Sequence, residues 1–115
     1  MERYKMNVEK LFHEWRASVD EAAKSKAEVV YLLEFRKSKK AILMQEAEIN
    51  GLKTGQERES YAYAHPEYLE LLVALKEATE ISEKFRWRMK IAEDRVGIYR
   101  THEANKRKEF TNYGN

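Results

Sequence analysis

The sequence has no cysteine, only one proline and only four glycines among its 115 residues. Without cysteine the chain can form no disulfide bond, no thiolate metal site and no cysteine-based catalytic centre. It also has no apolar run near the length of about 18 residues that crosses a membrane, and the residues after Met1 are polar rather than the apolar core of a signal peptide. We therefore expect a soluble protein of the cytoplasm.

The scarcity of glycine and proline, together with abundant Glu, Lys, Ala, Leu and Arg, predicts an all-α fold. Apolar residues make up 43% of the chain and charged residues 37%, which is too apolar for simple disorder. We expect one helical domain over residues 1–115, with Asn7 as the first N-cap. The expected elements are a helix at about 8–50, a link and short helix at 51–65, a long helix at 66–108 and a frayed tail at 109–115.

The helical pattern breaks at only two places. Asn50-Gly51 ends the first long helix, because glycine suits the left-handed position after a helix C-terminus. Thr54 is then the expected N-cap of the short helix, and Glu57 its capping-box partner. His65-Pro66 starts the second long helix, with His65 as a weak cap, since proline fits the first turn of a helix.

Apolar residues of the second long helix recur at alternating spacings of three and four. They form a heptad stripe of Leu71, Leu75, Ala78, Ser82, Phe85, Met89, Ala92, Val96 and Tyr99. Such a stripe is typical of a coiled-coil seam, and a helix of roughly 60 Å is too long to bury itself in so small a protein. We therefore expect the two long helices to run antiparallel as an extended hairpin that oligomerises through coiled-coil-like seams.

The first long helix has a less regular apolar stripe. It runs through Val8, Phe12, Trp15, Val19, Ala22, Val29, Leu33, Leu43 and Ala47. Where Lys26, Arg36 and Lys40 interrupt this stripe, the apolar face is expected to rotate to Leu32, Phe35, Ile42 and Ile49. Further apolar residues outside either seam favour self-association, because a two-helix hairpin buries little surface.

The chain contains no arrangement of side chains that is typical of an enzyme. Its histidines, His13, His65 and His102, lack the spacing of a metal site, so surface or capping roles are expected for them. The loop at 51–55 lacks the Walker spacing, and the glutamates are those of solvated helix surfaces. We expect no catalytic residue, no metal ion and no cofactor.

Two basic stretches are the strongest candidates for a binding site. The first consists of Arg36, Lys37, Lys39 and Lys40, on the first long helix. The second consists of Lys84, Arg86, Arg88 and Lys90, on the second long helix, and alternates with Phe85, Trp87 and Met89. Cations around an aromatic ring suit single-stranded DNA, whose bases stack and whose phosphates pair. Two alternatives stay open, a solvated helix surface and a tryptophan that packs against another subunit.

The hairpin places the two basic stretches at similar distances from the turn. We therefore expect them to lie at similar heights and to form one basic band that tracks phosphates. Residues 67–83 contain five glutamates against one lysine, whereas residues 84–108 contain nine bases against three acids. The acidic half is expected to meet basic residues of a neighbouring subunit or of a protein partner.

The layout of these features resembles the UvsY family of phage recombination mediators. The resemblance rests on Trp15, on the stretch Leu33-Glu34-Phe35-Arg36-Lys37-Ser38-Lys39-Lys40-Ala41, on a short acidic link with tyrosines, and on a long last helix with Trp87. It implies a ring-shaped homo-oligomer in the host cytoplasm that binds single-stranded DNA, helps to displace single-strand-binding protein and loads a RecA-like recombinase. Family DNA contacts involve basic residues of the first long helix, here Arg36, Lys37, Lys39 and Lys40. The compact link at 51–55 and His65-Pro66 depart from the family's pattern.

The leading hypothesis is therefore an oligomeric, non-enzymatic accessory protein of phage recombination that binds single-stranded DNA. One alternative is a small phage protein that binds and inhibits a host nuclease or defence complex. The other is a structural coiled-coil assembly factor. A gel shift with a single-stranded oligonucleotide separates the first hypothesis from the third, and affinity capture from a lysate separates it from the second.

Overall fold

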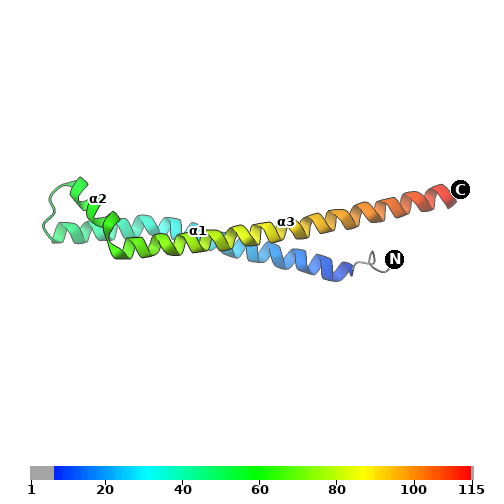
Figure 1. Cartoon of the computed structure of the whole chain (residues 1–115), viewed down its shortest axis with the longest axis horizontal. Coiled ribbons are helices and arrows are strands. Elements are labelled where there is room, and N and C mark those ends of the chain that lie inside the picture. Colours follow the sequence, from blue (N-terminus) through cyan, green and yellow to red (C-terminus); the bar gives the residue numbers. More distant parts are fainter. Residues whose placement is uncertain (1–6, 115) are drawn as a thin grey trace. The chain divides into compact units, whose positions relative to one another are not determined.

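The computed structural model contains three helices between residues 7 and 114, the part of the chain that it describes (Figure 1). They are α1 at Val8–Ile49, α2 at Gly55–Ala64 and α3 at Pro66–Gly114. The three helices contain 42, 10 and 49 residues, and no strand occurs among the described residues. The predicted all-α fold, with two long helices joined by a short one, is confirmed.

Both ends of α1 have the capping interactions that the sequence predicts. At its start, Asn7 Oδ1 accepts from a backbone N–H of the first turn at 3.1 Å, which confirms the expected N-cap. At its end, Gly51 has a φ of +93°. The N–H of Gly51 donates to Glu48 O, and the N–H of Leu52 donates to Ala47 O, each at 3.0 Å. This pair of bonds is the Schellman motif, which satisfies the last carbonyls of a helix.

Thr54 and His65 cap the two following helices. Thr54 Oγ1 accepts from the N–H of Glu57 at 3.1 Å, as expected of an N-cap. The carboxylate of Glu57 accepts from the N–H of Lys53 at 3.3 Å, so the reciprocal half of the capping box lies one residue earlier than predicted. Nδ1 of His65 accepts from a backbone N–H in the first turn of α3 at 3.1 Å, and Pro66 is the first residue of that helix.

The last helix is longer than predicted. α3 continues to Gly114, although the sequence pattern ends it at Lys108. No proline follows Lys108, and the hydroxyl of Thr111 donates to Arg107 O at 2.9 Å. Nothing in this segment therefore stops the helix. Asn115, the last residue of the predicted frayed tail, lies outside the described residues.

The chain divides into two compact units, each built from a segment of α1 and a segment of α3. The turn unit contains residues 24–83, and the terminal unit contains, of the described residues, 7–23 and 84–114. The segments run antiparallel within each unit, since Lys39 meets Glu67 and Glu46 meets His65 in the turn unit, whereas Phe12 meets Tyr99 and Glu14 meets Arg95 in the terminal unit.

Each unit has a small apolar core. In the turn unit, Leu43, Ala62 and Tyr68 come together from the three helices, and Met44 packs against them. In the terminal unit, the buried apolar side chains include Leu11, Ala92 and Val96. The cores are narrow because each helix contributes only one face to them.

Burial along α3 follows the heptad stripe in both units. The stripe residues Leu71, Leu75, Ala78 and Ser82 of the turn unit are buried or half-buried, and so are Phe85, Met89, Ala92, Val96 and Tyr99 of the terminal unit. Every other residue between Leu69 and His102 is exposed. The heptad positions therefore form the face of α3 that packs against the rest of its own chain.

The apolar stripe predicted for α1 is wrong at Val19 and Leu33, which are exposed, whereas its other members are buried or half-buried. Of the residues expected where the face rotates, Leu32 is half-buried, but Phe35, Ile42 and Ile49 are exposed. The buried or half-buried positions in this part of α1 are Ser18, Ala22, Ser25, Val29, Leu32, Arg36 and Lys39, which again alternate by three and four. Serine and alanine fit close to a partner helix, and lysine and arginine lay their aliphatic stems along it.

Candidate nucleic-acid interface

Cations of the first basic stretch form ion pairs with acidic residues of α2 and of the first turn of α3. Lys39 Nζ lies 2.6 Å from a carboxylate oxygen of Glu67, and Lys40 Nζ lies 2.9 Å from one of Glu59. Lys40 also lies over the ring of Tyr63, with its Nζ 4.8 Å from the centroid. Lys39 and Lys40, two of the four predicted DNA-binding cations of this stretch, therefore already have partners on other helices.

The pKa values of this cluster reflect the ion pairs. The interaction with Tyr63 and the hydrogen bond to Glu59 raise the pKa of Lys40 to about 12. The hydrogen bond from Lys39, reinforced by its positive charge, lowers the pKa of the Glu67 carboxyl. Both shifts favour the charged forms of Lys40 and Glu67 at neutral pH.

The other two cations of the first basic stretch differ in exposure. Lys37 is exposed and lies 3.2 Å from Glu34, one turn earlier on α1. Arg36 is half-buried, at a position that faces the partner helix. The exposed pair of Lys37 and Glu34 contributes little to the free energy of folding, so another anion can easily replace Glu34.

The predicted common height of the two basic stretches is wrong. Lys39 lies opposite Glu67, in the first turn of α3, which precedes Lys84 by about five helical turns. The two long helices therefore pair in a different register from the one assumed. The single basic band expected from the sequence is replaced by a first stretch that faces Glu59 and Glu67.

The second basic stretch surrounds an exposed tryptophan. The side chain of Trp87 is 54% exposed, and the guanidinium carbon of Arg86 lies 4.7 Å from the centroid of its ring. The guanidinium carbon of Arg88 lies 5.3 Å from the ring centroid of Phe85, which is half-buried on the heptad face. Trp87 thus lies off the face that packs within the chain, with cations on both sides of it in sequence.

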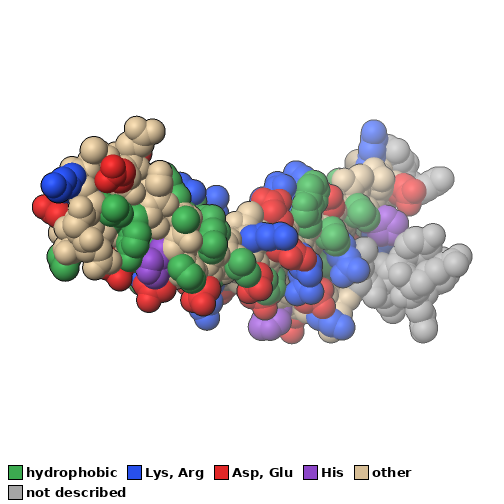
Figure 2. All heavy atoms as spheres, turned by 60° about the vertical axis from the view of Figure 1, so that its left-hand side comes forward, with side chains coloured by type: hydrophobic (Ala, Val, Ile, Leu, Met, Phe, Trp, Pro, Cys, Tyr) green, Lys and Arg blue, Asp and Glu red, His purple; other side chains and the backbone are tan. Residues whose placement is uncertain are grey.

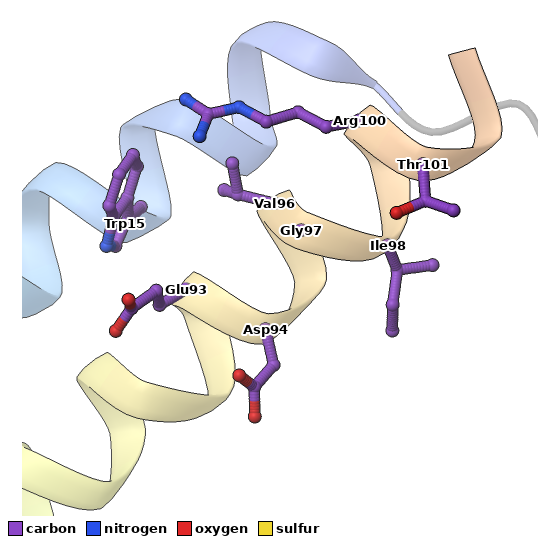
Figure 3. A pocket seen from close by; sticks show the side chains of 8 residues that line it. All are labelled: Trp15, Glu93, Asp94, Val96, Gly97, Ile98, Arg100 and Thr101. Atoms are coloured by element: carbon purple, nitrogen blue, oxygen red, sulfur yellow. The ribbon is translucent and has the colours of Figure 1, made fainter. Parts of the chain in front are cut away.

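A groove between α1 and α3 in the terminal unit was missed by the sequence analysis. It has a volume of about 750 Å³ and is lined by Trp15 from α1 and by residues of α3, among them Glu93, Gly97 and Arg100 (Figure 3). The guanidinium carbon of Arg100 lies 5.9 Å from the centroid of the Trp15 ring. The sequence pattern predicts Trp15 as a member of the apolar stripe and as part of the resemblance, and Gly97, a glycine within an otherwise uninterrupted helix, is the signal that indicates space beside α3.

Large apolar side chains lie exposed outside the cores. Figure 2 shows hydrophobic side chains between acidic and basic ones on one face of the molecule. Most of the exposed large apolar residues belong to the turn unit, including Tyr31, Phe35, Ile42, Leu72 and Val73. Tyr31 and Phe35 stack on each other with an interplanar angle of 8°. These side chains give the turn unit more exposed apolar surface than is typical of two helices that face only solvent.

Between residues 7 and 114, no three His, Asp or Glu side chains come together as a group that could hold a metal ion. None of the helices in this part of the chain combines the length and the apolar character of a membrane-spanning segment.

Comparisons with known proteins add no relative. No protein-family model matches the chain, and no curated protein or solved structure is significantly similar to it.

Proposed function

We propose that this protein binds single-stranded DNA without catalysing a reaction, and that the second basic stretch with Trp87 is its principal contact surface. The observation that carries this proposal is the half-exposed ring of Trp87, with Arg86 lying against it and Arg88 and Lys90 exposed beside it. An aromatic face accepts any base by stacking, and the flanking cations pair with phosphates.

The first basic stretch has a smaller part in this proposal. A phosphate that approaches Lys39 or Lys40 competes with Glu67 or Glu59 for the ammonium group. Lys37 is more accessible to a phosphate, since its own side chain and that of its partner Glu34 are both exposed. The ion pairs with Glu67 and Glu59 therefore reduce what Lys39 and Lys40 add to DNA affinity.

Self-association belongs to the same proposal. The exposed apolar residues of the turn unit favour contact with a second copy, and repeated weak DNA sites in one assembly raise overall affinity through their high effective concentration. Loading of a RecA-like recombinase and displacement of single-strand-binding protein are the role that the resemblance to the UvsY family implies. That part of the proposal rests on the resemblance alone.

A structural coiled-coil assembly factor is the second candidate, favoured by the same exposed apolar residues. In this case Trp87 packs against another subunit and its arginines cover the ring. Trp87 fluorescence should then change when the assembly dissociates on dilution. It should not change when DNA is added. The first candidate predicts a response to DNA at constant protein concentration.

The experiment is a titration of a labelled single-stranded oligonucleotide, followed by fluorescence anisotropy, with paired Trp87 variants. Trp87→Tyr keeps a stacking ring and should bind as the parent protein does. Trp87→Leu keeps an apolar side chain without a ring and should weaken binding roughly 5- to 100-fold, the effect of losing one stacked base. Lys53→Gln, at an exposed lysine beside the turn, is the charge-removal control. Equal affinities for the tyrosine and leucine variants would rule out stacking on Trp87.

A further inference from the structure

The groove of the terminal unit combines an aromatic ring, a cation and a carboxylate around open space. Trp15 contributes the ring from α1, and Glu93 and Arg100, two turns apart on α3, contribute the charged groups. In Figure 3, Glu93 points toward Trp15, whereas Asp94 and Ile98 point away from it. The volume of about 750 Å³ falls in the range of small-molecule sites.

Gly97 lines this groove without a side chain. It lies inside α3, where glycine is less favourable than alanine by about 1 kcal/mol. A Cβ added at this position would meet no atom within 4 Å, so no close packing within the chain requires a glycine. The absence of a side chain instead leaves space along the groove in front of Trp15, which a ligand can enter.

The three groups that line the groove match the parts of a nucleotide. A base can stack against Trp15 and the guanidinium of Arg100 can pair with a phosphate. The carboxylate of Glu93 accepts hydrogen bonds, and the exocyclic amino groups of cytosine, adenine and guanine donate them. Thymine has no such amino group and offers only its ring N3–H, which lies between two carbonyl oxygens that repel a carboxylate, so Glu93 disfavours thymine at this position.

The groove also lies on the same face of α3 as part of the second basic stretch. Arg86, Lys90, Glu93, Gly97 and Arg100 follow one another at spacings of four, three, four and three, which keeps them in one row of the helix. Lys90 and Gly97 are separated by two turns, or about 10 Å. A strand that pairs with Arg86 and Lys90 can therefore continue along this row to the groove.

We propose that the groove binds one nucleotide of the strand held by the second basic stretch: the base stacks on Trp15 and donates its amino group to Glu93, and Arg100 pairs with a phosphate. This inference rests on the proposed binding of single-stranded DNA. It adds a second aromatic contact and a preference for bases with an amino group, neither of which follows from Trp87.

The experiment uses Trp15 as its own reporter. Trp15 and Trp87 are the two tryptophans of the chain, so Trp87→Phe keeps a stacking ring and leaves Trp15 as the only tryptophan. In this background an oligonucleotide should quench Trp15 fluorescence. Adding Gly97→Leu, which fills the groove, should abolish the quenching and weaken binding about five- to tenfold. Gly97→Ala is the matched control, and it should retain both quenching and affinity.

A second variant tests base recognition without changing the shape of the groove. The parent protein should bind an oligocytidylate about five- to tenfold more tightly than an oligothymidylate, and Glu93→Gln should remove most of that difference. The helical circular dichroism of each variant checks that it folds.

The outcomes separate the two proposals. DNA binding that depends on Trp87, with no quenching of Trp15 and no effect of Gly97→Leu, overturns the groove and leaves the proposed function intact. Loss of the quenching in the Gly97→Leu variant, with retention in Gly97→Ala, supports the groove. No binding of DNA to the parent protein at any salt concentration overturns both.

Discussion

The two basic stretches predict different salt dependences of DNA binding, and two charge variants test this. One variant replaces the four cations of the second stretch with glutamine, at Lys84, Arg86, Arg88 and Lys90. The other removes the two ion pairs of the first stretch together, as Lys39→Gln, Lys40→Gln, Glu59→Gln and Glu67→Gln, so that its net charge is unchanged. Binding of single-stranded DNA releases counterions, and the logarithm of the affinity falls linearly with the logarithm of salt concentration.

The expected slopes follow from the number of phosphates contacted. Each phosphate neutralised on a single strand contributes about −0.7, so the loss of four contacts makes the slope shallower by about 2.8. The ion-pair variant should keep the parent slope, because Lys39 and Lys40 are held by Glu67 and Glu59 at 2.6 and 2.9 Å. If both lysines left their partners for phosphates, the same variant would lose about 1.4 of the slope.

The assay is fluorescence anisotropy of a labelled single-stranded oligonucleotide at several sodium chloride concentrations, with helical circular dichroism as the check on folding. The reasoning from the ion pairs is refuted if their removal reduces the slope as much as removal of the second stretch does. In that case the carboxylates yield to phosphate, and the first stretch is the main site.

The remaining predictions concern stability and assembly. Leu43→Ala should lower the free energy of unfolding by about 2–5 kcal/mol in a urea titration, because Leu43 is 1% exposed, whereas Ile42→Ala, at a neighbour that is 54% exposed, should cost less than about 1 kcal/mol at low protein concentration. Lys39 lowers the pKa of Glu67, so the stability from this pair is present above the usual carboxyl pKa and is lost as pH falls through the lower folded pKa; the melting temperature of Glu67→Gln should therefore fall less on acidification than that of the parent. Phe35→Glu should reduce the mass measured by light scattering if the turn unit self-associates, and an unchanged mass would assign the contact to another surface.

The helix boundaries were largely predictable from sequence because local chemistry sets them. Gly51 is the residue that tolerates a φ of +93°, and Thr54 supplies an oxygen for the first N–H groups of α2. His65-Pro66 places a cap and a residue without an N–H where α3 begins. None of these effects depends on residues far away in the chain. The end of α3 was missed because no such residue marks it before Gly114.

The inward face of α1 was not predictable in the same way. Periodicity alone favoured Val19 and Leu33, which lie one position beyond Ser18 and Leu32, the residues that face the chain's interior. A shift of one residue rotates the face by about 100°, and apolar residues on several faces of α1 fit more than one choice. The contacts with α3 and α2 decide between them, and those contacts are not local.

The candidate site was predictable in composition but not in pairing. The exposure of Trp87 follows from its offset to the heptad stripe, which the sequence contains. The partners of Lys39 and Lys40 depend on the register of α1 against α3 and on the position of α2, so the sequence alone could not distinguish free cations from paired ones. The groove at Trp15 required the same register, since its other wall comes from residues far along the chain.

The choice of residues that face inward on α1 also links folding to assembly. Ser18, Ser25 and Lys39 occupy positions where a self-sufficient hairpin would bury larger apolar groups, so the gain from hydrophobic burial within one chain is limited. Apolar side chains such as Phe35 and Ile42 lie outside instead, mostly in the turn unit. A partner that covers these side chains buries additional apolar surface. Because such a partner binds the folded chain and not the unfolded chain, assembly of this kind stabilises the fold by mass action. The second basic stretch belongs to the terminal unit, whose exposed residues are richer in cations. We therefore propose that the turn unit carries the contacts for assembly and the terminal unit the contacts with DNA.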